Sequence, residues 1–242
     1  MGLPKNYLKA RRALEETTQS ASRPKISVSN EGSSSRVNIY AEIGVWGVTS
    51  SDVAAAFADI PSDHSVDVHI NSPGGDVYDG LAIYQTLKSA PQNVTVHIDG
   101  LAASAASFIA MAGDTIEMGR NSRFMIHDAS TITFGNAQDH LDTAAWLSEE
   151  SDNIADIYAQ NAGGTAAEWR TKMKAETWYS AQQALDAGLI DSIQGAEDSV
   201  TRSVTASLFR NTPGGPAAPV DVDPFAGIDL AQVATALKGA FS

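Results

Sequence analysis

The stretch VDVHINSPGGDVYDGLAIYQTLKSAPQNVTVHIDGLAASAASFIAMA, residues 66–112, decides the fold class. Apolar and polar residues alternate at 66–70 and again at 94–98, which indicates two half-buried strands. Residues 80–89 carry apolar side chains at helical spacing, and the run 103–112 indicates a second helix. Because strands and helices alternate at short spacing, the stretch predicts a parallel sheet with helices packed on it.

The same pattern continues on both sides of this stretch. Ordered structure is expected to begin at Val37. Further strands are predicted at 37–41, 115–118, 124–126 and 189–193, and further helices at 53–58, 137–160, 169–174 and 180–188. On the long helix, Leu141, Ala144, Leu147, Ile154 and Ile157 share one stripe. The fold class is therefore α/β, with a mostly parallel sheet flanked by helices.

The two ends of the chain differ from the middle in composition. Residues 1–35 hold six Lys/Arg against three acids and end in a Ser-rich run, which predicts a flexible basic N-terminal arm. Residues 36–208 form the predicted domain. Residues 209–224 contain four prolines and two glycines and predict a linker, and a short helix is expected at 228–241.

Composition excludes several classes of protein and of chemistry. The chain has 242 residues, of which 43% are hydrophobic, so it is not wholly disordered. It has no cysteine, which excludes disulfides, thiolate metal sites and a cysteine nucleophile. A net charge of −13 argues against general nucleic-acid binding. The longest apolar run, residues 101–112, is shorter than the roughly 20 residues of a membrane span, and no signal-peptide core begins the chain, so a soluble, unsecreted protein is expected.

The turn at residues 72–75, Ser-Pro-Gly-Gly, lies between a predicted strand and a predicted helix. A phosphate cradle is one interpretation, but the turn lacks both GxGxxG and the lysine of GxxxxGK[ST]. An oxyanion hole is the second, because glycines let backbone N–H groups face a site without obstruction. A tight turn with no further role is the third.

Ser104 lies where a strand leads into the helix of small residues at 103–112. A nucleophile at this position would be stabilised by the positive end of the helix dipole. The alternative is a helix packed closely on the sheet, with Ser104 or Ser107 as its N-cap.

His127 ends a short apolar strand, where a side chain can emerge from the edge of the core. Asp128 follows it and is either an orienting acid or a solvated turn residue. His69 and His97 alternate within strands and are interpreted as sheet-surface residues. A serine nucleophile needs a base, and the base needs an acid, whatever their order in the sequence. The residues alone thus give an α/β domain with a candidate Ser/His pair and a candidate oxyanion turn.

Three segments together resemble the ClpP serine protease family. They are NSPGG at 71–75, GxAAS at 100–104 and NSRxMIH at 121–127, in the family's order, and the resemblance extends over residues 37–195. Within this superfamily, GLAIY at 80–84, GLAASAAS at 100–107 and ETWYSA at 176–181 are similar to the ClpP-type head maturation (prohead) proteases of tailed phages.

The resemblance implies a ClpP/crotonase-type fold and assigns roles position by position. Ser104 matches the nucleophile and His127 the general base. The N–H groups of Gly75 and Ala105 match the oxyanion hole. Glu176 occupies the place of the family's triad aspartate.

Asp128 is the alternative acid. The long helix 137–160 matches the protruding handle helix, which mediates contact between rings. No metal or cofactor is implied.

The function implied is a serine endopeptidase that cleaves scaffold or major capsid protein during phage head assembly, in the host cytoplasm and the prohead interior. Homo-oligomeric rings are implied, without nucleic-acid or membrane partners. Residues 209–242 would be a scaffold-type extension open to self-cleavage. The alternatives are the proteolytic subunit of an ATP-dependent Clp protease, a non-catalytic capsid or scaffold component, and a crotonase-type acyl-CoA enzyme. The N-terminal arm lacks the ClpP family's usual start, which argues against docking to an unfoldase ATPase.

Overall fold

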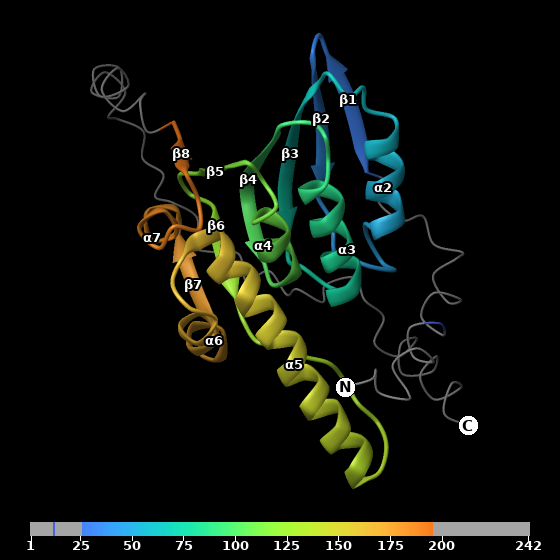
Figure 1. The fold of residues 1–242 in the computed structure, drawn as a ribbon, viewed down its shortest axis with the longest axis vertical. Coiled ribbons are helices and arrows are strands. Elements are labelled where there is room, and N and C mark those ends of the chain that lie inside the picture. The colour runs from blue at the N-terminus through green and yellow to red at the C-terminus, as the bar shows by residue number, and fades with distance from the viewer. Residues whose placement is uncertain (1–11, 13–25, 196–242) are drawn as a thin grey trace, which may run out of the picture.

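The computed structural model describes Arg12 and residues 26–195, and in this part of the chain a single mixed sheet is flanked by helices (Figure 1). Its strands are β1 (Ser27–Glu31), β2 (Ser34–Ile39), β3 (Ser65–Ser72), β4 (Val94–Ala103), β5 (Thr115–Gly119), β6 (Arg123–Ile126), β7 (Thr177–Ser180) and β8 (Ser192–Gln194). The helices are α2 (Ser50–Ala58), α3 (Val77–Lys88), α4 (Ala105–Ala110), α5 (Ala137–Ala162), α6 (Ala166–Lys174) and α7 (Ala181–Asp186).

The sheet has the order β1-β2-β3-β4-β5-β8, with β6 paired to β4 and β7 paired to β6. The pairs from β2 to β8 and the β4–β6 pair are parallel, whereas β1–β2 and β6–β7 are antiparallel. The mostly parallel α/β sheet expected from the sequence is therefore confirmed. Both antiparallel pairs lie outside its parallel centre.

The core lies between one face of this sheet and helices α2, α3 and α4, which lie together over that face (Figure 1), and it continues to buried residues of α5, α6 and α7. In β3, the side chains alternate between buried and more exposed, and Val66, Val68 and Ile70 are fully buried. Every residue of α4 is buried, which small side chains allow. A Cβ on Gly80 would approach a ring atom of Phe108 to 2.7 Å, so α3 packs against α4 at nearly backbone distance.

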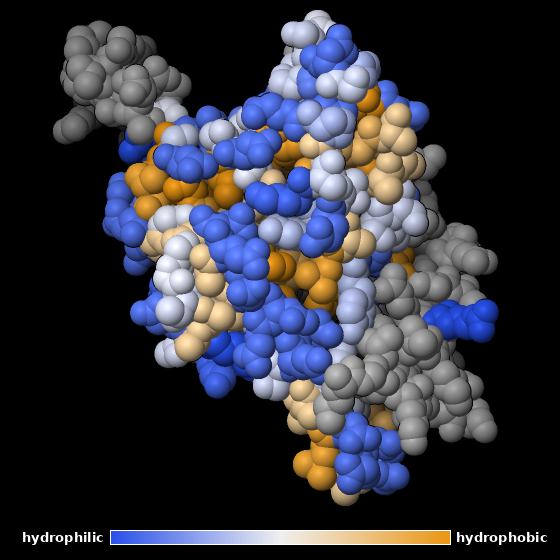
Figure 2. Space-filling view, in the orientation of Figure 1, coloured by the Kyte–Doolittle hydropathy of each residue, from blue (hydrophilic) through white to orange (hydrophobic). Residues whose placement is uncertain are grey.

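Helix α5 extends away from the sheet and packs along α6 near its C-terminal end (Figure 1). The long helix was predicted correctly, and the stripe expected on it is only partly buried. Ile154 of that stripe is buried, whereas Leu141 is 63% exposed, and Trp146 and Tyr158, outside the stripe, are also buried. Figure 2 shows apolar surface at the end of the molecule formed by distal α5 and the segment before it. The exposed large apolar side chains of this region are Ile132, Phe134 and Leu141.

Several boundaries differ from the sequence prediction. Order begins before Val37, because Ser27–Glu31 and Ser34–Ile39 pair as an antiparallel hairpin. Strand β4 continues to Ala103, because its last three residues pair with β6, so α4 starts only at Ala105. The last strand is Ser192–Gln194 rather than 189–193. The predicted linker and helix at 209–242, and residues 1–11 and 13–25, lie outside the described residues.

Among the described residues, no helix combines the length and the apolar character needed to cross a bilayer.

Candidate active site

Ser104 lies at the junction of β4 and α4 in a strained backbone conformation. Its φ is 53° and its ψ is −123°, a region that residues with a Cβ rarely adopt. It occupies the N-cap position of α4, but its side chain makes no capping hydrogen bond. The interpretation of Ser104 as an ordinary N-cap is therefore wrong, and its hydroxyl is available for another partner.

That partner is His127. Strand β6 pairs in parallel with the end of β4, with Ala103 opposite Met125, so both strands end at the same edge. The N–H of Ser104 donates to the carbonyl of Met125 at 3.0 Å. When the proton of His127 is on Nδ1, its Nε2 accepts a hydrogen bond from the Ser104 hydroxyl, and the Nε2–Oγ distance is 2.7 Å. The structure thus brings together two residues that are 23 positions apart in the sequence.

The imidazole of His127 is held in its neutral form by its surroundings. Burial lowers its pKa below the ordinary value of 6.5, while the charges of Glu176 and Asp128 raise it to a lesser extent. A neutral imidazole can accept a proton, which is what a general base for Ser104 must do.

The carbonyl of Ser104 is fixed from inside the core. The hydroxyl of Ser107 donates to this carbonyl and lies 2.6 Å from the hydroxyl of Tyr158 on α5. Tyr158 is only 1% exposed. Sequence reasoning treated Ser107 as a rival N-cap. Its hydroxyl instead links the strained turn to the long helix.

The glycine turn lies directly against Ser104. A Cβ on Gly74 would come within 2.7 Å of both the Ala105 nitrogen and the Ser104 Cβ. A Cβ on Gly75 would come within 2.0 Å of the Ile43 carbonyl oxygen. The turn is also braced by Ile43, whose N–H donates to the carbonyl of Gly74 and whose carbonyl accepts from the N–H of Asp76. Both glycines are needed because the backbone segments approach so closely.

Two backbone N–H groups beside Ser104 remain without a partner among residues 26–195. No hydrogen bond within that range uses the N–H of Gly75 or of Ala105. These are the donors that the sequence resemblance assigns to the oxyanion hole. The assignment stays a prediction, supported by the proximity of the turn to the start of α4.

The two candidate acids have different surroundings. Glu176 has a φ of 49°, and its carboxylate accepts a hydrogen bond from Trp178 Nε1 at 3.3 Å. Asp128 is bound at both carboxylate oxygens by Arg170. Within the described part of the chain, neither acid hydrogen-bonds to His127. Ser104 and Glu176 are the two non-glycine residues with positive φ in that part of the chain, and strain of this kind concentrates at functional sites.

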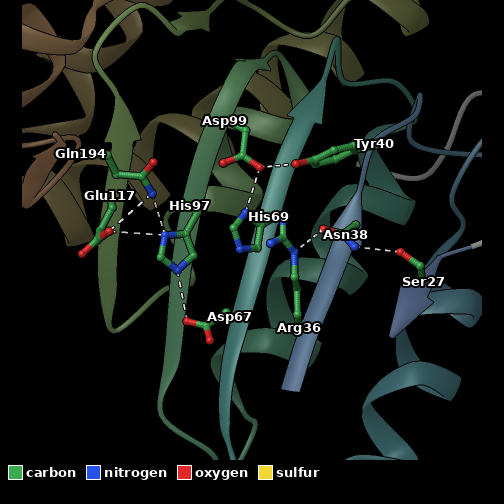
Figure 3. Close-up of polar contacts among 10 residues, drawn as sticks. All are labelled: Ser27, Arg36, Asn38, Tyr40, Asp67, His69, His97, Asp99, Glu117 and Gln194. Atoms are coloured by element: carbon green, nitrogen blue, oxygen red, sulfur yellow. Dashed lines mark hydrogen bonds and ion pairs between the residues drawn. The ribbon is translucent and has the colours of Figure 1, made fainter. Parts of the chain in front are cut away.

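His69 and His97 lie away from this site, on the face of the sheet opposite the helices (Figure 3). Their rings stack with centroids 4.5 Å apart. His69 Nδ1 lies 2.8 Å from Asp99, and His97 Nε2 lies 3.1 Å from Asp67. Further members of this network are Tyr40, Arg36, Glu117 and Gln194. The prediction that both histidines are sheet-surface residues is correct, although their mutual stacking was not foreseen.

No group of three or more His, Cys, Asp or Glu side chains in the described ranges is arranged to hold a metal ion.

Comparison with known proteins identifies the family of this chain. A family model described as Clp protease matches residues 50–197, more than half of the chain. The chain belongs to the Clp protease family. It is 32% identical over 130 residues to ATP-dependent Clp protease proteolytic subunit 1 of Corynebacterium jeikeium, which covers 53% of this chain and 69% of that protein. It is 34% identical over 133 residues to the ATP-dependent Clp protease proteolytic subunit of Deinococcus radiodurans, covering 54% of this chain and 65% of that protein. Subunit 2 of Corynebacterium glutamicum is 32% identical over 130 residues, with 65% of that protein covered.

The family match covers the glycine turn, Ser104, His127 and Glu176. The chain spans about two thirds of the length of these relatives.

Proposed function

We propose that this protein is a serine endopeptidase in which Ser104 is the nucleophile and His127 the general base. The observation that carries the proposal is the 2.7 Å contact between Ser104 Oγ and the neutral, half-buried imidazole of His127. Membership of the Clp protease family supports the same chemistry. The formed Ser104–His127 contact favours a catalytic protein over a scaffold component that merely retains the fold.

In the proposed reaction, His127 Nε2 takes the proton of Ser104 as Oγ attacks the scissile carbonyl carbon. The oxyanion is held by the N–H groups of Gly75 and Ala105, and losing one such donor typically costs about 2.7–4 kcal/mol. His127 then gives its proton to the leaving amine, and water repeats the sequence on the acyl-enzyme. Glu176 is the proposed orienting acid, because its charge acts on His127 and both oxygens of Asp128 are bound to Arg170.

The test is covalent labelling with a fluorophosphonate, followed by peptide mass spectrometry. The expected result is one adduct on Ser104 that disappears in His127→Ala and persists in His140→Ala, a matched change at an exposed histidine of α5. An adduct that survives in His127→Ala, or no adduct on the assembled protein, would contradict the proposal.

Two biological roles follow from this activity. The named relatives are subunits of ATP-dependent Clp proteases, which supports a Clp proteolytic subunit better than a head maturation protease. The head maturation role rests on the similarity of the sequence at residues 80–84, 100–107 and 176–181 to that of head maturation proteases. Degradation of a folded substrate only when a Clp ATPase and ATP are added would favour the first role. ATP-independent cleavage of a co-expressed scaffold or capsid protein would favour the second.

We also propose that the distal end of α5 takes part in self-association. Ile132, in the segment before α5, is 74% exposed, and Leu141, near the start of α5, is 63% exposed. Apolar side chains grouped in this way mark contact surfaces. Leu141→Asp should reduce the assembled mass measured by light scattering, whereas Asp142→Asn, a change at the next exposed position, should not.

A further inference from the structure

The residue that follows His127 is held by an unusually complete set of contacts. Arg170 on α6 binds Asp128 through two parallel hydrogen bonds, Nε to Oδ1 at 2.8 Å and Nη2 to Oδ2 at 3.0 Å. Two parallel bonds of this kind fix both the position and the plane of a carboxylate. The side chain of Arg170 is 13% exposed and that of Asp128 is 32% exposed, so the pair is partly shielded from water.

The same guanidinium also reaches the long helix. Its Nη1 donates to Asp152 at 2.5 Å and to the carbonyl of Ser148 at 3.4 Å, both on α5. One residue after Asp128, the N–H of Ala129 donates to Ser151 Oγ, again on α5, at 2.9 Å. The chain leaving His127 is therefore fastened to α6 through Arg170 and to α5 through Ser151.

These contacts have an electrostatic consequence for the imidazole. The charged groups that act on His127 are Glu176, from the segment before β7, and Asp128; both raise its pKa against the effect of burial. The positively charged Arg170 of α6 forms an ion pair with Asp128 and a second ion pair with Asp152 of α5. Asp128 raises the pKa of His127 even with Arg170 in place, and removing the guanidinium would take away the positive charge that opposes this effect.

We propose that Arg170 is a positioning residue for His127, acting through Asp128. It fixes the position of the backbone that follows His127 relative to Ser104, and it hydrogen-bonds to both carboxylate oxygens of Asp128. Asp128, held in the plane of the guanidinium, is the less suited of the two acids to orient the imidazole, and the proposal gives the role of third triad member to Glu176. This inference rests on the proposed function of His127 as the base, and nothing in the resemblance or the family match assigns a role to Arg170.

The experiment measures His127 directly, with and without catalysis. Diethyl pyrocarbonate reacts with neutral imidazoles, so the pH dependence of His127 modification, followed by peptide mass spectrometry, reports its titration in active and inactive protein alike. In Arg170→Gln, the midpoint should move to higher pH, and fluorophosphonate labelling of Ser104 should slow by about 10- to 100-fold through misplacement of the base. Adding Asp128→Asn to that variant removes the uncompensated charge and should return the midpoint to that of the wild type or below.

Two further variants separate charge from geometry. Arg170→Lys keeps the positive charge but loses the planar fork, so it should slow labelling without raising the midpoint. Asp152→Asn removes the charge of another partner of the same guanidinium, a side chain that is 66% exposed, and it should change neither quantity.

The proposal is overturned if Arg170→Gln leaves the midpoint in place, if the shift persists in the double variant, or if Arg170→Lys labels as fast as the wild type. Should Arg170→Gln fail to fold, the Arg170→Lys comparison still decides the positioning role. Wild-type protein that titrates as expected but never labels at Ser104 would refute the proposed function instead, so the two failures are distinguishable.

Discussion

Replacement of Gly74 by alanine tests whether the turn beside Ser104 depends on the absence of a side chain. The added Cβ would lie 2.5 Å from the carbonyl oxygen of Ala103 and 2.7 Å from the nitrogen of Ala105. Both neighbours are backbone atoms at the end of β4 and the start of α4, so neither can rotate away. The turn and the Ser104 junction must therefore separate.

The expected magnitude has two contributions. Gly74 has a φ of +92°, and a left-handed conformation disfavours a residue with a Cβ by about 1–2 kcal/mol. Overpacking in a rigid environment adds about 1–3 kcal/mol. The free energy of unfolding should thus fall by about 2–5 kcal/mol. Ser104 labelling should also be lost in the folded fraction, because the separation displaces the Ala105 N–H.

The matched control is Gly32→Ala, in the β1–β2 turn. Gly32 has a φ of +63°, but an added Cβ would meet nothing within 4 Å. This variant should lose only about 1–2 kcal/mol and label normally. Urea denaturation gives the two free energies, and fluorophosphonate labelling below the transition gives the activity. Equal destabilisation by the two substitutions, or normal labelling of Gly74→Ala, would refute the close-approach argument.

Three further predictions follow from the site and the sheet. Because burial lowers the pKa of His127, labelling of Ser104 should persist as the pH falls to 6.5 and should be lost only when the pH falls through the lowered pKa. A midpoint above pH 6.5 in the labelling profile would contradict this. Burial also lowers the pKa of His69, so the folded state binds a proton at this residue less readily than the unfolded state does. The contribution of His69 to stability is therefore present above pH 6.5 and lost on acidification. His69→Gln should flatten this part of the pH–stability curve measured by thermal unfolding. Ser107→Ala leaves the buried Tyr158 hydroxyl without its partner and should lower the free energy of unfolding in urea by about 1–3 kcal/mol. Adding Tyr158→Phe should recover part of this loss. If the effects of the two substitutions are fully additive, the two hydroxyls do not interact.

The parallel centre of the sheet was predictable because its strands must bury one face. In β3, this requirement produces the alternation of Val66, Val68 and Ile70 with polar neighbours. The edge strand β1 was missed for the complementary reason. Its residues 27–30 are exposed, with Val28 38% accessible, so burial imposes no alternation on them.

The contact between Ser104 and His127 was foreseen from the position of each residue at the end of a predicted strand, combined with the resemblance. The extension of β4 to Ala103 and its pairing with β6 were not, because strand pairing between distant segments leaves little local signal. The contact of Arg170 with Asp128 spans 42 positions, and no spacing rule connects them. The strain at Glu176 is likewise imposed by the packing around it rather than by its own sequence.

The positive φ angles of Ser104 and Glu176 have an evolutionary consequence. Glycine would adopt either conformation without steric strain, which releases about 1–2 kcal/mol at each position against about 0.5–1 kcal/mol of added chain entropy. Variants of this protein that are selected only for thermal stability, without selection for catalytic activity, should therefore acquire glycine at these two positions early. The positions at which such a lineage gains stability by losing a side chain would then mark the proposed active site, without any substrate being identified.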